Sequence, residues 1–173
     1  MRPPHKPVAA AASAALAILL TACSVSVGSG GGYDPDDVAE RVQEAQEEAT
    51  PDLEVTDPSC PDDGEPAEGD AIECTVTIAG VEAPYTVTFT SVDDDGARFD
   101  IAPAQAIVST EKAVAAIAAE LDKQGVAGVE VDCGEAAVLV QEPATTFTCA
   151  LTRGVRSSEL TVTINDVDGN ISF

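Results

Sequence analysis

Hydrophobic and polar residues alternate in two separate parts of this chain as half-buried β-strands require. In the first part, Ile72–Ile78 and Tyr85–Thr90 place an apolar side chain at every second position. Thr146–Leu151 and Leu160–Ile164 follow a similar pattern in the second part. Shorter strands are predicted on either side of each pair, at Leu53–Cys60, Arg98–Ile101, Val129–Cys133 and Asn170–Phe173.

A helix is predicted before each group of strands. The first begins after Asp34, whose carboxylate suits a helix N-cap, and ends before Pro51. Its predicted buried stripe consists of Val38, Val42, Ala45 and Ala49, with Gln46 among the residues placed on the wet side. The second begins after Ser109 or Thr110 and ends at Gly125. Its predicted buried stripe consists of Val114, Ile117, Ala118 and Leu121.

The two parts follow the same order, which predicts a tandem repeat. Tyr85–Phe89 aligns with Leu160–Ile164, and each part holds two cysteines on its first two strands. The predicted fold class is α+β, with two repeats at residues 34–102 and 103–173. Each repeat is one helix packed on a four-stranded antiparallel sheet with one disulfide.

The first 22 residues have the layout of a secretory signal. Arg2 and Lys6 precede an apolar run from Val8 to Leu20, which is too short to span a bilayer as a mature helix. The run closes on Leu20-Thr21-Ala22-Cys23, which resembles the lipobox of bacterial lipoproteins. The alternatives are an ordinary signal peptide with a cysteine nearby and an uncleaved helix. The resemblance implies cleavage after residue 22 and acylation (palmitate or a similar chain) of Cys23.

The lipobox reading predicts the location of the protein. Two acyl chains on Cys23 give stable membrane attachment, where a single chain would be marginal. Residues 23–33, rich in glycine and serine, are then the lipidated cysteine and a flexible linker. We expect a protein of the cell membrane, lipid-anchored on the extracytoplasmic face.

The charge balance narrows the choice of partner. The chain has 31 acidic and 8 basic residues, a net charge of −23. Nucleic acid is excluded as a partner because its binding depends on Lys and Arg contacts to phosphates. Close contact with an anionic lipid surface is disfavoured by the same charge. The acidity is best explained by solubility on a crowded cell surface, and attraction of a basic protein, an envelope component or divalent ions is the alternative. His5 is the one histidine of the chain and belongs to the signal, so the mature protein lacks the commonest general base and metal ligand.

Five cysteines leave one without a partner if the others pair. Lipidation accounts for Cys23. The other four allow three pairings, of which the repeat favours Cys60–Cys74 and Cys133–Cys149. Metal-ligating or catalytic thiols are the alternative, but the chain has no Cys-x-x-Cys pair. We expect no metal site and no cofactor.

Acidic residues are unevenly divided between the two predicted repeats. Residues 34–102 carry 21 acidic and 2 basic residues, whereas residues 103–173 carry 10 and 4. Arg153 and Arg156 flank a hairpin at Gly154, where the first repeat has Glu82 in the corresponding hairpin. This difference fits either distinct surroundings or drift.

Two aspartate-rich stretches, Asp93–Gly96 and Asp166–Asn170, have a composition similar to calcium loops. They lack the closing glutamate of an EF-hand, and Asp-Gly is a hairpin signal, so structural turns are favoured.

Residues 38–101 and 110–173 each resemble a domain-of-unknown-function family common in actinobacterial membrane and cell-wall proteins. Val55–Cys60 with Glu73–Val76 carries the first match, and Val129–Cys133 with Thr148–Leu151 carries the second. The resemblance implies the architecture and no active site. We expect a non-enzymatic binding or structural module of the cell envelope. The alternatives are an enzyme inhibitor similar to the β-lactamase inhibitory proteins and an enzyme that uses paired carboxylates.

Overall fold

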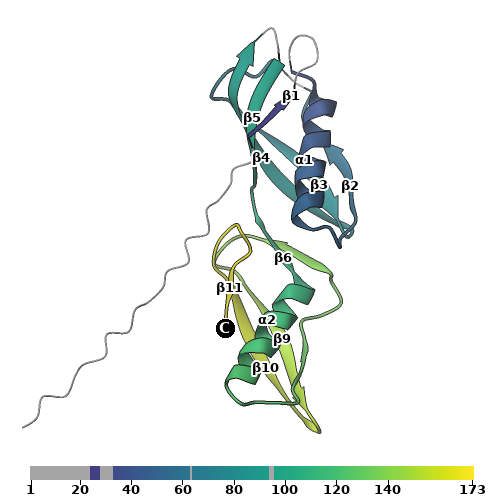
Figure 1. Ribbon diagram of the computed structural model, residues 1–173, viewed down its shortest axis with the longest axis vertical. Helices are drawn as coiled ribbons and strands as arrows, with labels where there is room; N and C mark the ends of the chain where they lie inside the picture. Colours follow the sequence, from purple (N-terminus) through teal and green to yellow (C-terminus); the bar gives the residue numbers. More distant parts are fainter. Residues whose placement is uncertain (1–23, 28–32, 63, 94–95) are drawn as a thin grey trace, which may run out of the picture.

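The computed structural model describes residues 24–27, 33–62, 64–93 and 96–173, which form two lobes (Figure 1). The first lobe consists of β1–β5 and α1, and the second lobe consists of β6–β11 and α2. All strand pairs in the described residues are antiparallel. The predicted mixture of helices with antiparallel sheets is therefore confirmed. Within these residues, no helix is both long and apolar enough to cross a membrane.

Helix α1 (Pro35–Ala49) begins and ends where the sequence predicts. The Asp34 side chain accepts a hydrogen bond from the backbone N–H of Asp36, at 3.0 Å, and so caps the helix. Pro35 occupies the first turn, where its missing N–H costs no hydrogen bond. Thr50 is the C-cap, directly before Pro51.

The buried side of α1 differs from the predicted stripe. Val38 and Val42 are buried as expected, but Ala49 is exposed, and Gln46, assigned to the wet side, is only 5% exposed. Gln46 accepts a hydrogen bond from the buried hydroxyl of Tyr85 on the facing sheet. This partner compensates for the burial of the amide, and apolar periodicity contains no sign of it.

The first lobe has a five-stranded sheet in the order β1-β5-β4-β3-β2. Its strands are β1 (Ser24–Val27), β2 (Val55–Ser59), β3 (Ala71–Ile78), β4 (Val81–Asp93) and β5 (Gly96–Pro103). Helix α1 covers one face of this sheet (Figure 1). The core between them includes Val42, Val76 and the T-shaped ring pair Phe89–Phe99.

Strand β1 corrects the prediction of a wholly flexible linker over residues 23–33. Ser24 pairs with Asp100 and Val27 pairs with Ala97, so β1 forms the edge of the sheet beside β5. A four-residue segment next to a glycine-rich run gives almost no periodic signal, whereas the open edge of β5 supplies unpaired backbone groups.

Helix α2 (Thr110–Lys123) begins directly after strand β6. Its N-cap is Ser109, the first of the two predicted candidates. Ala113 and Ile117 are buried, while Val114, Ala118 and Leu121 of the predicted stripe are half-buried. The true buried side is thus turned slightly from the predicted one.

The second lobe has two sheets rather than one. A four-stranded sheet has the order β11-β10-β9-β7, and a separate two-stranded sheet joins β6 and β8. The strands are β6 (Ala106–Ser109), β7 (Glu130–Asp132), β8 (Val138–Gln141), β9 (Thr146–Arg153), β10 (Arg156–Ile164) and β11 (Ile171–Ser172). β6 and β8 were not predicted.

We call the pair β6–β8 the bridging ribbon, because its two faces contact different cores. Val138 is buried in the core of the first lobe, and Ile107 and Val140 pack against that core. Ala106 and Val108 belong to a core of the second lobe, with Leu139 packed beside them. Successive strand residues point to opposite faces, so four-residue strands suffice to serve both lobes.

Candidate binding groove

The structure joins Cys60 to Cys74 and Cys133 to Cys149. Each bond ties the residue that follows a short strand, β2 or β7, to the next long strand, β3 or β9. Cys74 and Cys149 are fully buried. Because all four sulfur atoms are in disulfides, none of them is available as a metal ligand or a catalytic thiol. Cys23, the predicted lipidation residue, lies outside the described residues.

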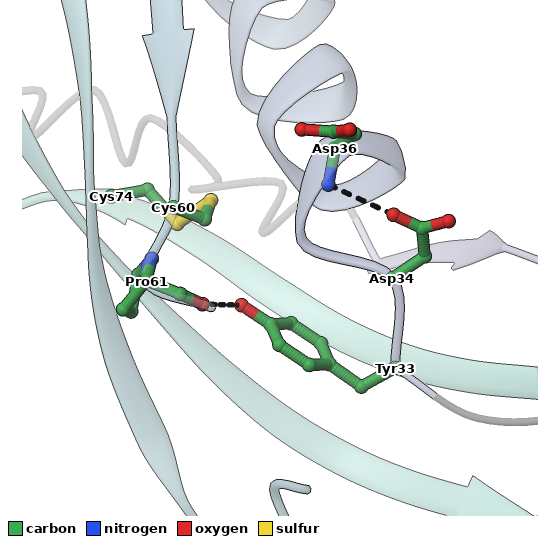
Figure 2. The surroundings of a disulfide bond; sticks show 6 residues. All are labelled: Tyr33, Asp34, Asp36, Cys60, Pro61 and Cys74. Carbon is green, nitrogen blue, oxygen red and sulfur yellow. Dashed lines mark hydrogen bonds between the residues drawn. A yellow bond between two sulfur atoms is a disulfide. The ribbon is translucent and has the colours of Figure 1, made fainter. Parts of the chain in front are cut away.

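Tyr33, directly before the N-cap of α1, lies beside the disulfide of the first lobe (Figure 2). Its hydroxyl donates to the backbone carbonyl of Pro61, the residue after Cys60, at 2.5 Å. Its ring meets Phe89 in a T-shaped contact with ring centroids 5.7 Å apart. The end of the predicted linker is therefore part of the folded lobe.

A groove of about 470 Å³ lies between the two lobes. Its walls are the C-terminal end of α1, the N-terminal half of α2 and the turn between β10 and β11. The lining is mostly small or apolar, with Ala49, Pro103, Ile107, Val108, Ala113, Ala116, Val167 and Ile171 among its residues. A smaller hollow of about 160 Å³ shares Thr50, Ser109 and Lys112 with it, so the two are adjacent. We call the larger one the interlobe groove.

The interlobe groove has few charged groups. Lys112 lies in the first turn of α2, where a cation is unfavourable because the helix dipole is positive there. No salt bridge to Lys112 is found among the described residues. Asp168 is the carboxylate in the lining. One amine and one carboxylate among apolar groups can orient a ligand.

The turn between β10 and β11 is held by a local hydrogen-bond network. The Asn170 side-chain amide donates to both carboxylate oxygens of Asp166, at 3.0 and 2.9 Å, and the Asn170 backbone N–H donates to Oδ1 at 3.1 Å. Asp166 therefore acts as a turn residue. The described residues contain no group of three or more His, Cys, Asp or Glu suited to a metal ion. Asp94 and Asp95 of the other aspartate-rich stretch lie outside the description.

Gly169 brings this turn against the bridging ribbon. Its backbone has φ +76°, and a Cβ atom placed there would lie 2.6 Å from the carbonyl oxygen of Ile107. Only glycine permits both the left-handed backbone and this approach. The glycine thus sets the distance between two walls of the groove.

Gln46 and Tyr85 connect the groove to the core of the first lobe. Gln46 lines the groove, and its Nε2 donates to the Thr50 hydroxyl at 2.7 Å. Burial raises the pKa of the Tyr85 phenol well above its ordinary value of 10. Tyr85 is therefore a neutral hydrogen-bond donor at physiological pH. Its role here is to position Gln46.

Sequence reasoning did not find the groove residues. Lys112 is the residue that the sequence could have indicated, because a lysine in the first turn of a predicted helix is unfavourable next to the positive end of the helix dipole. Asp168-Gly169 predicts a turn but not a groove wall. Gln46 and the small alanines of α1 and α2 give no signal, because the groove is formed by segments far apart in the chain.

Comparison with known proteins gives one family. Residues 18–94 match the family described as Domain of unknown function (DUF4333), so a domain of this kind is present there. The match includes the lipobox-like segment, α1, β2, β3 and β4, and it stops before β5. Residues 110–173, expected to resemble the same kind of family, lie outside it. No curated protein and no solved structure matches the chain.

Proposed function

We propose that this protein is a non-enzymatic binding or structural module of the cell envelope, anchored by lipid on Cys23 to the extracytoplasmic face of the membrane. The two disulfides support an extracytoplasmic location, because such bonds persist in oxidising surroundings outside the cytosol. They also account for four of the five cysteines and leave Cys23, at the end of the lipobox-like segment, for the lipid.

The interlobe groove supports the binding role. Its volume of about 470 Å³ is within the range of small-ligand sites, which often lie between structural units. Apolar walls with one amine and one carboxylate suit a partner segment that is mostly apolar and carries charge at one or two points. We propose this groove as the site at which an envelope component or a protein segment is held.

We further propose that the chain holds two copies of one domain, at residues 34–102 and 103–173. In support, each lobe contains a helix, a short strand, a disulfide to the next strand and a long hairpin, in that order. The bridging ribbon would then be an addition by which the second copy packs against the first.

The anchor is tested by changing Cys23 to Ser and separating membranes from soluble protein in the native host. We expect the variant in the soluble or secreted fraction, and the wild type and a Ser24→Ala control with the membranes. Retention of Cys23→Ser in the membrane fraction would contradict the lipid anchor.

The groove is tested with a variant that fills it. Ala116 is an exposed alanine in the groove wall, whereas Ala119 is an exposed alanine of the same helix outside the lining. In crosslinking on intact cells, Ala116→Trp should lose a recurrent partner that Ala119→Trp keeps. Equal recovery with both variants would place the binding site elsewhere. Nanomolar inhibition of a secreted hydrolase would instead favour the inhibitor alternative.

A further inference from the structure

The hairpin of β9 and β10 ends in an unusual tip. Gly154 and Val155 form its two-residue loop, and Arg153 pairs directly with Arg156 across it. Gly154 has φ +63°, which suits the first central position of a type II′ hairpin turn. We call Arg153–Arg156 the basic tip. In Figure 1 the hairpin extends away from the first lobe at the far end of the second.

The charges of the basic tip do not stabilise the isolated protein. Like charges directly opposite each other on paired strands repel. Both arginines are exposed, and no salt bridge to either is found among the described residues. They are two of the 8 basic residues in a chain with 31 acidic ones, so acidic side chains that could pair with them are plentiful in the chain. Their placement together points to an external anion.

Val155 adds an apolar contact at the same place. Its exposed fraction is 103%, the highest among the exposed large hydrophobic residues of the described chain. The corresponding hairpin of the first lobe, between β3 and β4, turns at Ala79–Gly80 and carries Glu82 two residues later. That tip has no basic residue, and its two exposed loop residues, Ala79 and Gly80, are small. The combination at the second hairpin is thus a local feature and not a general property of these hairpins.

We propose that the basic tip docks onto an anionic phospholipid surface, with Val155 in the headgroup region and the two arginines on lipid phosphates. An apolar apex flanked by basic residues is the composition of interfacial membrane contacts. The guanidinium group matches phosphate geometry with two parallel hydrogen bonds. Each arginine contributes roughly a fivefold gain in partitioning onto such a surface.

The position of β1 makes this contact compatible with the anchor, and this step rests on the proposed function. Ser24 pairs with Asp100, in the half of β5 that leads to the second lobe. A lipid on the residue before Ser24 would therefore tether the molecule through the β1 edge of the first sheet. Residues 34–102, with 21 acidic and 2 basic residues, are repelled by anionic lipid more strongly than residues 103–173, which have 10 acidic and 4 basic residues. The tether supplies a high local concentration, so a weak contact suffices to orient the molecule.

A tryptophan at the tip tests the docking, because the chain has no native tryptophan. Val155→Trp is prepared in the full protein and in its Cys23→Ser form. Both are mixed with vesicles of phosphatidylglycerol and phosphatidylcholine, and with vesicles of phosphatidylcholine alone. We expect a blue shift of the emission, and quenching by brominated lipid, only with the anionic vesicles. Glu82→Trp, on the other hairpin, should show neither change.

Charge-matched variants test whether Arg153 and Arg156 make the contact with the vesicles. In the Val155→Trp background, Arg153→Gln with Arg156→Gln should weaken binding to anionic vesicles about 25-fold, as two fivefold steps. Arg41→Gln with Lys123→Gln removes the same charge from α1 and α2, outside the groove lining, and should leave binding nearly unchanged. Sedimentation of the Cys23→Ser protein with native Val155 repeats the comparison without the added indole.

The outcomes separate the proposals. A shift in the Cys23→Ser form supports the tip contact whether or not the anchor exists. Equal shifts on both vesicle types, no shift, or equal loss in the two double variants would overturn it. Recovery of an acidic protein through the arginines, without any vesicle binding, would also overturn it and assign the tip to a protein partner.

Discussion

The buried pair of Gln46 and Tyr85 shows what single residues contribute to this fold. The phenol of Tyr85 donates to Gln46, and the two residues are 3% and 5% exposed. Removing the Tyr85 hydroxyl leaves the Oε1 atom of Gln46 buried without its donor, which costs about 1–3 kcal/mol. The sequence contains a glutamine on a predicted wet face and a tyrosine on an alternating strand. Nothing local indicates that they meet.

Tyr85→Phe should therefore lower the free energy of unfolding by about 1–3 kcal/mol, measured by urea denaturation. The double variant Tyr85→Phe with Gln46→Leu should recover part of that loss, because neither polar group then remains buried. Gln46→Leu alone is the third variant, which gives the cost of the glutamine change by itself. A fully additive double variant would show that the hydrogen bond contributes little.

Burial of Tyr85 also determines how the free energy of unfolding changes at alkaline pH. Its pKa is raised in the folded protein, so above pH 10 the unfolded chain loses a phenol proton that the folded protein keeps. This contribution to stability is complete below pH 10 and declines as the pH rises beyond it. The expected slope is about 1.4 kcal/mol per pH unit. Urea midpoints between pH 9 and 11 should show a steeper decline for wild type than for Tyr85→Phe. Equal declines would mean that another group governs the alkaline limb.

Gly169 carries a prediction about the groove wall. Gly169→Ala combines a left-handed backbone with a clash against the Ile107 carbonyl. Gly154→Ala has a similar φ but nothing within 4 Å, so it isolates the backbone cost of about 1–2 kcal/mol. Gly169→Ala should be more destabilising than Gly154→Ala in thermal unfolding. If the two are equal, the turn moves away from the ribbon at little cost.

At the scale of elements, the sequence was informative wherever a local rule decides. Asp34 with Pro35 marks the start of α1, and alternation marks β3, β4 and β10 with their hairpins. The bridging ribbon could not be found in this way. Its four-residue strands have apolar side chains on both faces, because each face packs against a different lobe. Period-2 alternation signals a strand with one wet face, and the ribbon has no such face.

The disulfides also act on elements, since each holds a short edge strand, β2 or β7, against its neighbour. The bonded cysteines are 14 and 16 residues apart, and closing loops of this size is expected to contribute about 3 kcal/mol each. Replacing both members of one pair by alanine should lower the unfolding free energy by about that amount. A loss well below 1 kcal/mol in either double variant would show that β2 or β7 is held by packing alone. Reduction with dithiothreitol of the wild type should give the sum of the two losses.

At the scale of the whole molecule, the ribbon determines whether the lobes behave as one unit. Val138 comes from the second segment of the chain but is 1% exposed in the core of the first lobe. Val138→Ala deletes buried methyl groups and should destabilise by about 1–3 kcal/mol. Because the other face of the ribbon packs in a core of the second lobe, both lobes should unfold together in one transition, at a lower denaturant concentration than in wild type. Hydrogen exchange of β3 and β10 amides reports the two lobes separately, and protection should fall in both.

Val162→Ala, buried in the second lobe alone, should give the same joint response. Loss of protection confined to the first lobe in Val138→Ala, and to the second in Val162→Ala, would mean that the lobes unfold independently. The groove between them would then open without global unfolding.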